Sequence, residues 1–106
     1  MAPITVLNDP NVSMWYYSDS KILHHQVHQF FFGPTFRDVM NKGIETLQKN
    51  GAHKWLADDR AVAAWAPEDM EWGNADWFPR AVKAGWKYWA IVMPEKIVGK
   101  MSLIEV

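Results

Sequence analysis

The chain has 106 residues, 49% of them hydrophobic and 22% charged, and this length and composition predict one globular domain over residues 1–106. Eleven Lys and Arg residues against 12 Asp and Glu residues give a net charge of −1, which argues against the clustered basic face of a nucleic-acid-binding protein. The lack of cysteine excludes disulfides, thiol nucleophiles and thiolate metal sites.

The N-terminal third of the chain predicts a β-hairpin. Residues 3–7 form either an edge strand or an ordered tail, and residues 12–18 and 21–28 are rich in strand-forming residues around a Ser-Asp-Ser turn. Alternation along the second strand places three side chains on the face expected to be the core side: Leu23, His25 and Val27. The face expected to be wet carries Ile22, His24, Gln26 and His28.

An amphipathic helix is predicted over residues 35–50, because apolar residues recur at helical spacing along one stripe. Gly43 lies on this stripe, where it permits a close backbone approach. Thr35 with Asp38 resembles a capping box at the start of the helix. Gly51 suits the cap at its C-terminal end.

A strand and a second helix follow. Residues 53–57 are short and apolar, which predicts a buried strand. The next helix is expected to begin near Pro67, a favoured first helical residue, and to end at Gly85. Pro79 lies inside this helix, where its missing N–H is expected to kink or break it.

The last clear strand is predicted over residues 86–93, whose continuous apolar run is typical of a central strand buried on both faces. Residues 95–106 fit a helix and a strand equally well. A hairpin followed by strand–helix–strand units predicts an α/β fold with a mixed sheet. Right-handed crossovers should place both helices on one face of that sheet.

The block between Trp55 and Trp89 holds six of the seven tryptophans and carries a family resemblance. Its motifs are KWLADDR, PED, EW, DWFPRA, AGWKY and MPE, within residues 54–95. With the element order, they are similar to the STAS domain, the fold of sporulation anti-anti-sigma factors. The motifs themselves more closely resemble those of uncharacterised bacterial and archaeal STAS-like proteins, which are sometimes described alongside CRAL-TRIO lipid-binding domains. The resemblance covers roughly residues 12–101.

Two departures limit what this resemblance implies. Anti-anti-sigma factors are switched by phosphorylation of a Ser or Thr after the third strand, and this chain has neither residue between Leu47 and Met101. The phosphoswitch therefore does not carry over. The family pattern also continues with a further helix and strand, so we expect C-terminal elements to be missing and one sheet edge to be exposed.

Asp58, Asp59 and Arg60 are the strongest functional candidates, because they follow a buried strand at the end where α/β sheets present ligand loops. Paired carboxylates perform acid–base chemistry if the pKa of one of them is raised. The alternative, which we favour, is a solvated loop in which Arg60 neutralises an Asp or an Asp caps the next turn.

A metal site is not expected at the three clustered histidines. His24 and His25 should point to opposite faces of a strand, and His24 and His28 lie ~13 Å apart at ~3.3 Å per residue. Zinc ligands must approach one ion to ~2 Å. Glycine-rich phosphate loops are absent too, so the sequence predicts no cofactor.

Three tryptophans, Trp65, Trp72 and Trp77, flank the acidic loop and its helix. Two interpretations stay open: they fill the core and a subunit interface, which we favour, or they form one wall of an apolar pocket.

We expect a non-enzymatic STAS-like domain that acts through protein–protein association, as a homodimer. The alternative is a carrier or sensor of a small apolar or lipid-like ligand, held between the Trp-rich helix and the sheet. A third hypothesis is an enzyme that uses Asp58 or Asp59. The sequence shows no signal-peptide pattern and no apolar run near the ~20 residues of a membrane span, so a cytoplasmic protein is expected.

Overall fold

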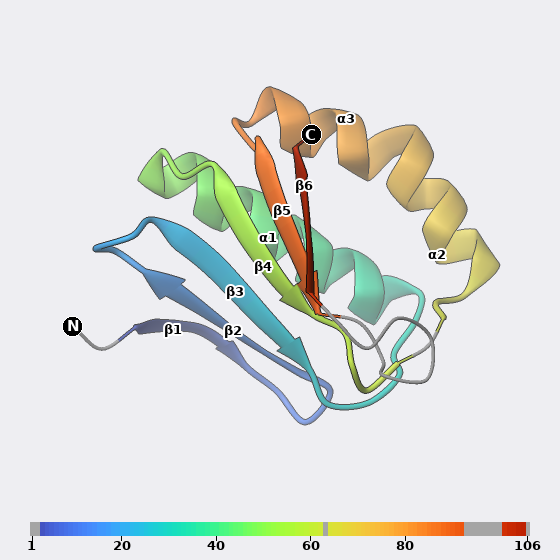
Figure 1. The fold of residues 1–106 in the computed structure, drawn as a ribbon. Coiled ribbons are helices and arrows are strands. Elements are labelled where there is room, and N and C mark those ends of the chain that lie inside the picture. Colours follow the sequence, from blue (N-terminus) through green and yellow to red (C-terminus); the bar gives the residue numbers. More distant parts are fainter. Residues whose placement is uncertain (1–2, 63, 93–100, 106) are drawn as a thin grey trace.

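The computed structural model describes residues 3–62, 64–92 and 101–105, and within them six strands form one sheet in chain order. The strands are β1 (Ile4–Asn8), β2 (Val12–Tyr17), β3 (Ile22–Val27), β4 (Lys54–Asp58), β5 (Tyr88–Val92) and β6 (Met101–Glu105). The central pairs β3–β4 and β4–β5 are parallel, and the three outer pairs are antiparallel. The predicted α/β fold with a mixed sheet is therefore confirmed, and the sheet is open (Figure 1).

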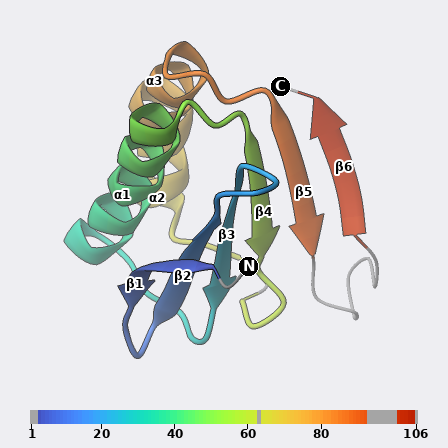
Figure 2. The same cartoon turned by 90° about the vertical axis from the view of Figure 1, so that its left-hand side faces the viewer.

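Two helical segments connect the parallel strands. The first is α1 (Pro34–Asn50). The second runs through α2 (Pro67–Trp72), the π-helical turn η1 (Gly73–Trp77) and α3 (Phe78–Lys83). Figure 2 shows all of them on the same side of the sheet, as right-handed crossovers require. The prediction that the helices share one face is confirmed.

The hairpin prediction is also confirmed, and β1 takes the edge-strand alternative. The core side of β3 is the predicted one, since Leu23, His25 and Val27 are 0%, 7% and 4% exposed. Among these three residues only His25 is polar, and it lies under the helices with the apolar core.

Helix α1 begins one residue earlier than predicted, and its predicted capping box is wrong. Gly33 is the N-cap, with a positive φ of 63°, and no side chain caps the helix. Pro34 then occupies the first helical position, where its fixed φ suits the helix and its missing N–H costs nothing. Thr35 therefore lies inside the helix. The predicted C-terminal cap is confirmed, because Gly51 adopts the left-handed conformation with φ of 60°.

Of the two outcomes predicted at Pro79, a kink or a break, the break does not occur, and the helix is instead distorted by a π-helical turn just before the proline. In a regular α-helix the proline ring would collide with the carbonyl of Ala75. Here a wider π-helical turn precedes it, in which the N–H of Phe78 bonds to the carbonyl of Gly73. The wider turn relieves the collision, and α3 continues to Lys83.

Strand β5 differs from the prediction of burial on both faces, because Trp89 through Val92 are only half-buried. The helices cover one face of the sheet, which leaves the other face of β5 open (Figure 2). Beyond β5, residues 101–105 take the strand alternative and pair antiparallel with it as β6, so the sheet has a strand where an exposed edge was expected. The predicted end of β5 at Pro94 lies outside the described residues.

The core lies between the helices and the sheet, and tryptophans dominate its centre. The rings of Trp55, Trp77 and Trp86 contact each other pairwise, with centroids 5.4–5.8 Å apart. Tilted and edge-to-face pairs of this kind contribute about 0.5–1.5 kcal/mol each beyond the area they bury.

Candidate functional site

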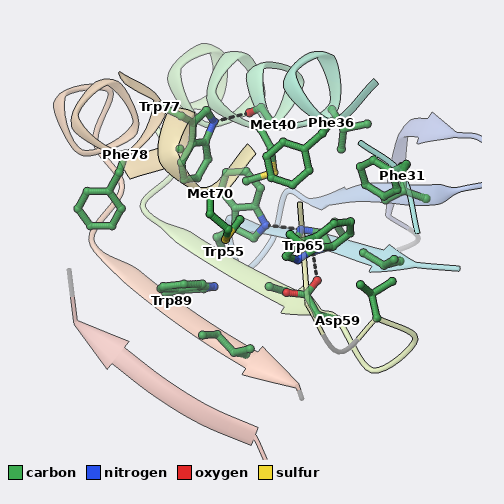
Figure 3. A pocket seen from close by; sticks show the side chains of 18 of the residues that line it. Phe31, Phe36, Met40, Trp55, Asp59, Trp65, Met70, Trp77, Phe78 and Trp89 are labelled. Atoms are coloured by element: carbon green, nitrogen blue, oxygen red, sulfur yellow. Dashed lines mark hydrogen bonds and ion pairs between the residues drawn. The ribbon is translucent and has the colours of Figure 1, made fainter. Parts of the chain in front are cut away.

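A cavity of about 370 Å³ lies between the sheet and the helices and is partly open to solvent (Figure 3). Five tryptophans line it: Trp55, Trp65, Trp77, Trp86 and Trp89. Three phenylalanines complete the aromatic lining: Phe31, Phe36 and Phe78. This volume is at the lower end of the range for small-molecule sites, and an aromatic lining is typical of them.

The secondary structure explains how these side chains reach one space. Alternation along β4 and β5 turns Trp55, Trp89 and Ile91 toward the helices. The long helical segment contributes Met70 and Trp77 from the opposite wall. The cavity therefore lies between two layers of regular structure, which hold most of its walls in place.

Three of the cavity tryptophans are fixed by hydrogen bonds from their indole N–H groups. Trp77 donates to the carbonyl of Met40 at 2.8 Å, and Trp86 donates to the carbonyl of Tyr88 at 3.0 Å. Trp55 donates to Nδ1 of His25 at 2.9 Å. Since each indole N–H is satisfied within the protein, these rings offer only their apolar faces and edges to a ligand.

The polar corner of the cavity is a chain of two hydrogen bonds, from Trp55 through His25 to Asp59. Nε2 of His25 lies 2.7 Å from Oδ1 of Asp59 (Figure 3). An indole N–H only donates, so Nδ1 of His25 accepts from Trp55 and carries no proton. The imidazole is therefore the neutral tautomer, which donates its single N–H to the Asp59 carboxylate.

The three predicted residues of the acidic loop separate into two groups. Asp59 lines the cavity, and its backbone N–H donates to the carbonyl of Val92 at 2.9 Å, which ties the loop to β5. Asp58 is the last residue of β4, and strand alternation turns it to the opposite face of the sheet. There its carboxylate accepts two hydrogen bonds from the Arg60 guanidinium, at 2.9 and 2.8 Å.

The ion pair with Arg60 determines the direction in which the pKa of Asp58 is shifted. Burial by itself would raise the pKa of Asp58, but the hydrogen bonds and the charge of Arg60, aided by His24, hold that pKa below its ordinary value of 3.8. Asp58 is thus an ionised partner of Arg60. The acid–base hypothesis required a raised pKa, and for Asp58 the shift is in the other direction.

The three predicted tryptophans also separate. Trp65 and Trp77 line the cavity as the pocket interpretation requires. Trp72 lies outside it, half-buried, with the guanidinium groups of Arg37 and Arg80 at 5.2 and 5.9 Å from its ring. Its aromatic face is thus used in cation–π contacts at the helix surface.

Sequence reasoning missed the contribution of His25. It placed this residue on the core face of β3, and a histidine there needs a hydrogen-bond partner, which was the available signal. The partners come from β4 and the loop after it, some 30 residues away in sequence, so no local pattern names them. Among the described residues, no group of three or more His, Asp or Glu side chains is arranged to hold a metal ion.

Two exposed phenylalanines lie next to the cavity. Phe30 and Phe32 are 49% and 64% exposed, and their rings stack at 5.9 Å. Phe30 also stacks on Trp65, which lines the cavity, at 6.0 Å. The cavity is therefore continuous with an aromatic surface patch, defined here as Phe30 and Phe32.

No protein-family model, no curated protein and no solved structure matches this chain. None of the helices in the described parts of the chain has the length and apolar character needed to cross a membrane.

Proposed function

We propose that this domain binds a small apolar ligand in the tryptophan-lined cavity, as a carrier or a sensor. The observation that carries this proposal is the cavity of about 370 Å³ between tryptophan side chains whose positions are fixed by their own hydrogen bonds. A space filled by side chains would have ended this hypothesis.

The physical argument concerns packing. Protein interiors are close-packed, and atoms that line an empty apolar space lose dispersion contacts. Apolar cavities accordingly take up apolar ligands. Each Å² of ligand and cavity surface removed from water contributes about 25 cal/mol, before the costs of association are subtracted.

A cavity-filling variant tests the proposal. Ile91→Trp places a large ring on the cavity side of β5, and Val92→Trp places the same ring on the other face of the same strand. Calorimetric titration with 4-phenylbutanol should show binding to the wild-type protein and to Val92→Trp, and at least tenfold weaker binding to Ile91→Trp. Equal affinity of all three proteins, or no binding to any, would contradict the proposal.

A second candidate is protein–protein association as a STAS-like homodimer. It is supported by a mixed sheet with helices on one face, in which a hairpin precedes strand–helix–strand units. A specific observation also favours it: the patch of Phe30 and Phe32 exposes two large aromatic rings, and aromatic residues are enriched in the centres of interfaces.

The oligomeric state tests this candidate. Light scattering at high micromolar concentration should give twice the monomer mass, and Phe30→Ser with Phe32→Ser should return the monomer mass. A monomeric wild-type protein would rule out the homodimer, and a dimer that survives both substitutions would move the interface elsewhere.

A further inference from the structure

The side chains that line the cavity include negative charge but no positive charge, within the described residues. Of its described lining residues, Asp59 is the single acidic one, and neither Lys nor Arg is among them. The other polar side chains are His25 and Asn74. Within the described lining, a charged ligand thus meets one carboxylate and no cation.

No protein cation in this network of Trp55, His25 and Asp59 offsets the charge of the Asp59 carboxylate. His25 is neutral, because its Nδ1 is committed as acceptor to the indole of Trp55. The single N–H of His25 donates its hydrogen bond to Oδ1 of Asp59. Among the described residues, no hydrogen bond uses Oδ2, and no fully buried side-chain oxygen lacks a partner. Oδ2 is therefore accessible and free to accept a hydrogen bond from a ligand.

The aromatic walls of the cavity also favour a positively charged ligand. The faces of indole and phenyl rings carry partial negative charge and attract cations, and tryptophan does so most strongly. A carboxylate beside aromatic walls recognises an ammonium group better than any neutral or anionic group. The contact between Oδ2 and an N–H⁺ would be a charge-assisted hydrogen bond.

We infer that the ligand is a small amphiphilic amine, with its ammonium group at Asp59 and its hydrocarbon part among the tryptophans. This inference rests on the proposed function and names its ligand class. Figure 3 shows Asp59 and Phe78 at opposite sides of the cavity, so the apolar part extends from Asp59 toward Trp77 and Phe78. Primary alkylamines resemble the lysine side chain, whose pKa is about 10.4, and carry a positive charge at neutral pH.

Fatty acids and other apolar carboxylates are not expected to be preferred ligands of this cavity. A carboxylate of the ligand would lose its hydration and would lie against the charge of Asp59. Desolvation and repulsion act in the same direction, and no Lys or Arg of the described lining offsets them.

A matched series of ligands tests the charge preference. The three probes are 4-phenylbutylamine, 4-phenylbutanol and 4-phenylbutyrate, which share one apolar skeleton and differ in their terminal group. Calorimetry at pH 7 should show the amine binding roughly tenfold or more tighter than the alcohol, and the acid binding weakest. Asp59→Asn should remove the preference for the amine and keep the affinity for the alcohol.

Asp76→Asn is the matched control, since Asp76 pairs with Arg80 on the helix surface, away from the cavity lining. It should leave all three affinities unchanged. Retained binding of the alcohol by Asp59→Asn shows that this variant is folded. Should it fail to fold, the wild-type protein provides a second test, because rising salt should weaken the amine and leave the alcohol unaffected.

The outcomes separate this inference from the proposed function. Equal binding of amine and alcohol, an amine preference that survives Asp59→Asn in a folded protein, or amine binding insensitive to salt would overturn the ligand class and leave the cavity as a binding site. A failure of all three probes to bind would overturn both.

Discussion

Two neighbouring histidines show how one residue type takes different roles at this site. His25 faces the helices and is held between Trp55 and Asp59. His24 faces the other side of the sheet, where its ring lies 5.0 Å from that of Trp15 and Nδ1 lies 3.3 Å from the hydroxyl of Tyr17. The alternation of the strand alone produces this difference.

The environment of His24 predicts a pH dependence of stability. Burial lowers the pKa of His24, and the nearby carboxylate of Asp58 offsets part of this lowering. Between the lowered pKa of His24 in the folded protein and the ordinary value of 6.5, the unfolded chain binds a proton at this site that the folded protein does not. The free energy of unfolding therefore falls as the pH drops below about 6.5.

The variant His24→Gln isolates this effect. Urea unfolding between pH 7.5 and pH 5 should show that the wild-type protein loses stability relative to His24→Gln as the pH falls. A difference between the two proteins that stays constant across this range would contradict the assignment.

For the acidic loop, the sequence predicted which residues are candidates but not the direction of their side chains. It identified Asp58, Asp59 and Arg60 as one candidate group at the end of a strand. The structure divides that group, because the last strand residue and the first loop residue point to different faces. Side-chain direction at a strand end depends on the path of the loop, which composition and spacing do not reveal.

At the scale of elements, the contact between α1 and β4 depends on a glycine. A methyl group on Gly43 would collide with Cη2 of Trp55 and lie 2.7 Å from its Cζ2. Trp55 is 3% exposed and its indole N–H is held by Nδ1 of His25, so its ring cannot move away from the helix without breaking that hydrogen bond. The close approach of the helix requires the absence of a side chain at position 43.

Gly43→Ala should therefore lower the free energy of unfolding. Alanine gains about 1 kcal/mol of helix propensity over glycine, but overpacking a rigid core costs typically about 1–3 kcal/mol and the collision here is severe. We expect a net loss, measured by urea unfolding.

Gly73→Ala is the matched control in the second helical segment. Gly73 has helical angles, φ of −58° and ψ of −46°, and a methyl group there meets nothing within 4 Å. This substitution should raise the free energy of unfolding by up to about 1 kcal/mol. Effects of the same sign at both glycines would contradict the packing account.

The second helical segment shows the limit of local rules for elements. The rule for proline predicted a kink or a break at Pro79, and the helix accommodates the ring through the π-helical turn Gly73–Trp77. Gly73, Asn74 and Trp77 from this turn line the cavity. Propensity rules describe regular helices, and they do not anticipate an extra residue in one turn.

At the scale of the whole molecule, the hydrophobic pattern was sufficient for the central part of the architecture, while the edge strands β1 and β6 were left as one of two alternatives each. The order of strands and helices, the mixed sheet and the helices on one face all followed from periodicity and crossover handedness. The cavity did not follow, because its lining comes from β2 to β5, both helical segments and the loops between them. Whether tryptophans fill a core or leave a space depends on their packing in three dimensions, which one sequence does not show.

The seven tryptophans allow a direct measurement of ligand binding in this cavity. Each indole N–H gives one signal in a ¹H–¹⁵N correlation spectrum, and five of them come from tryptophans that line the cavity. Trp15 and Trp72 lie outside it and serve as internal controls. On titration with 4-phenylbutylamine, the signals of Trp55, Trp65, Trp77, Trp86 and Trp89 should shift together. Unchanged spectra, or shifts confined to Trp15 and Trp72, would contradict ligand binding in the cavity.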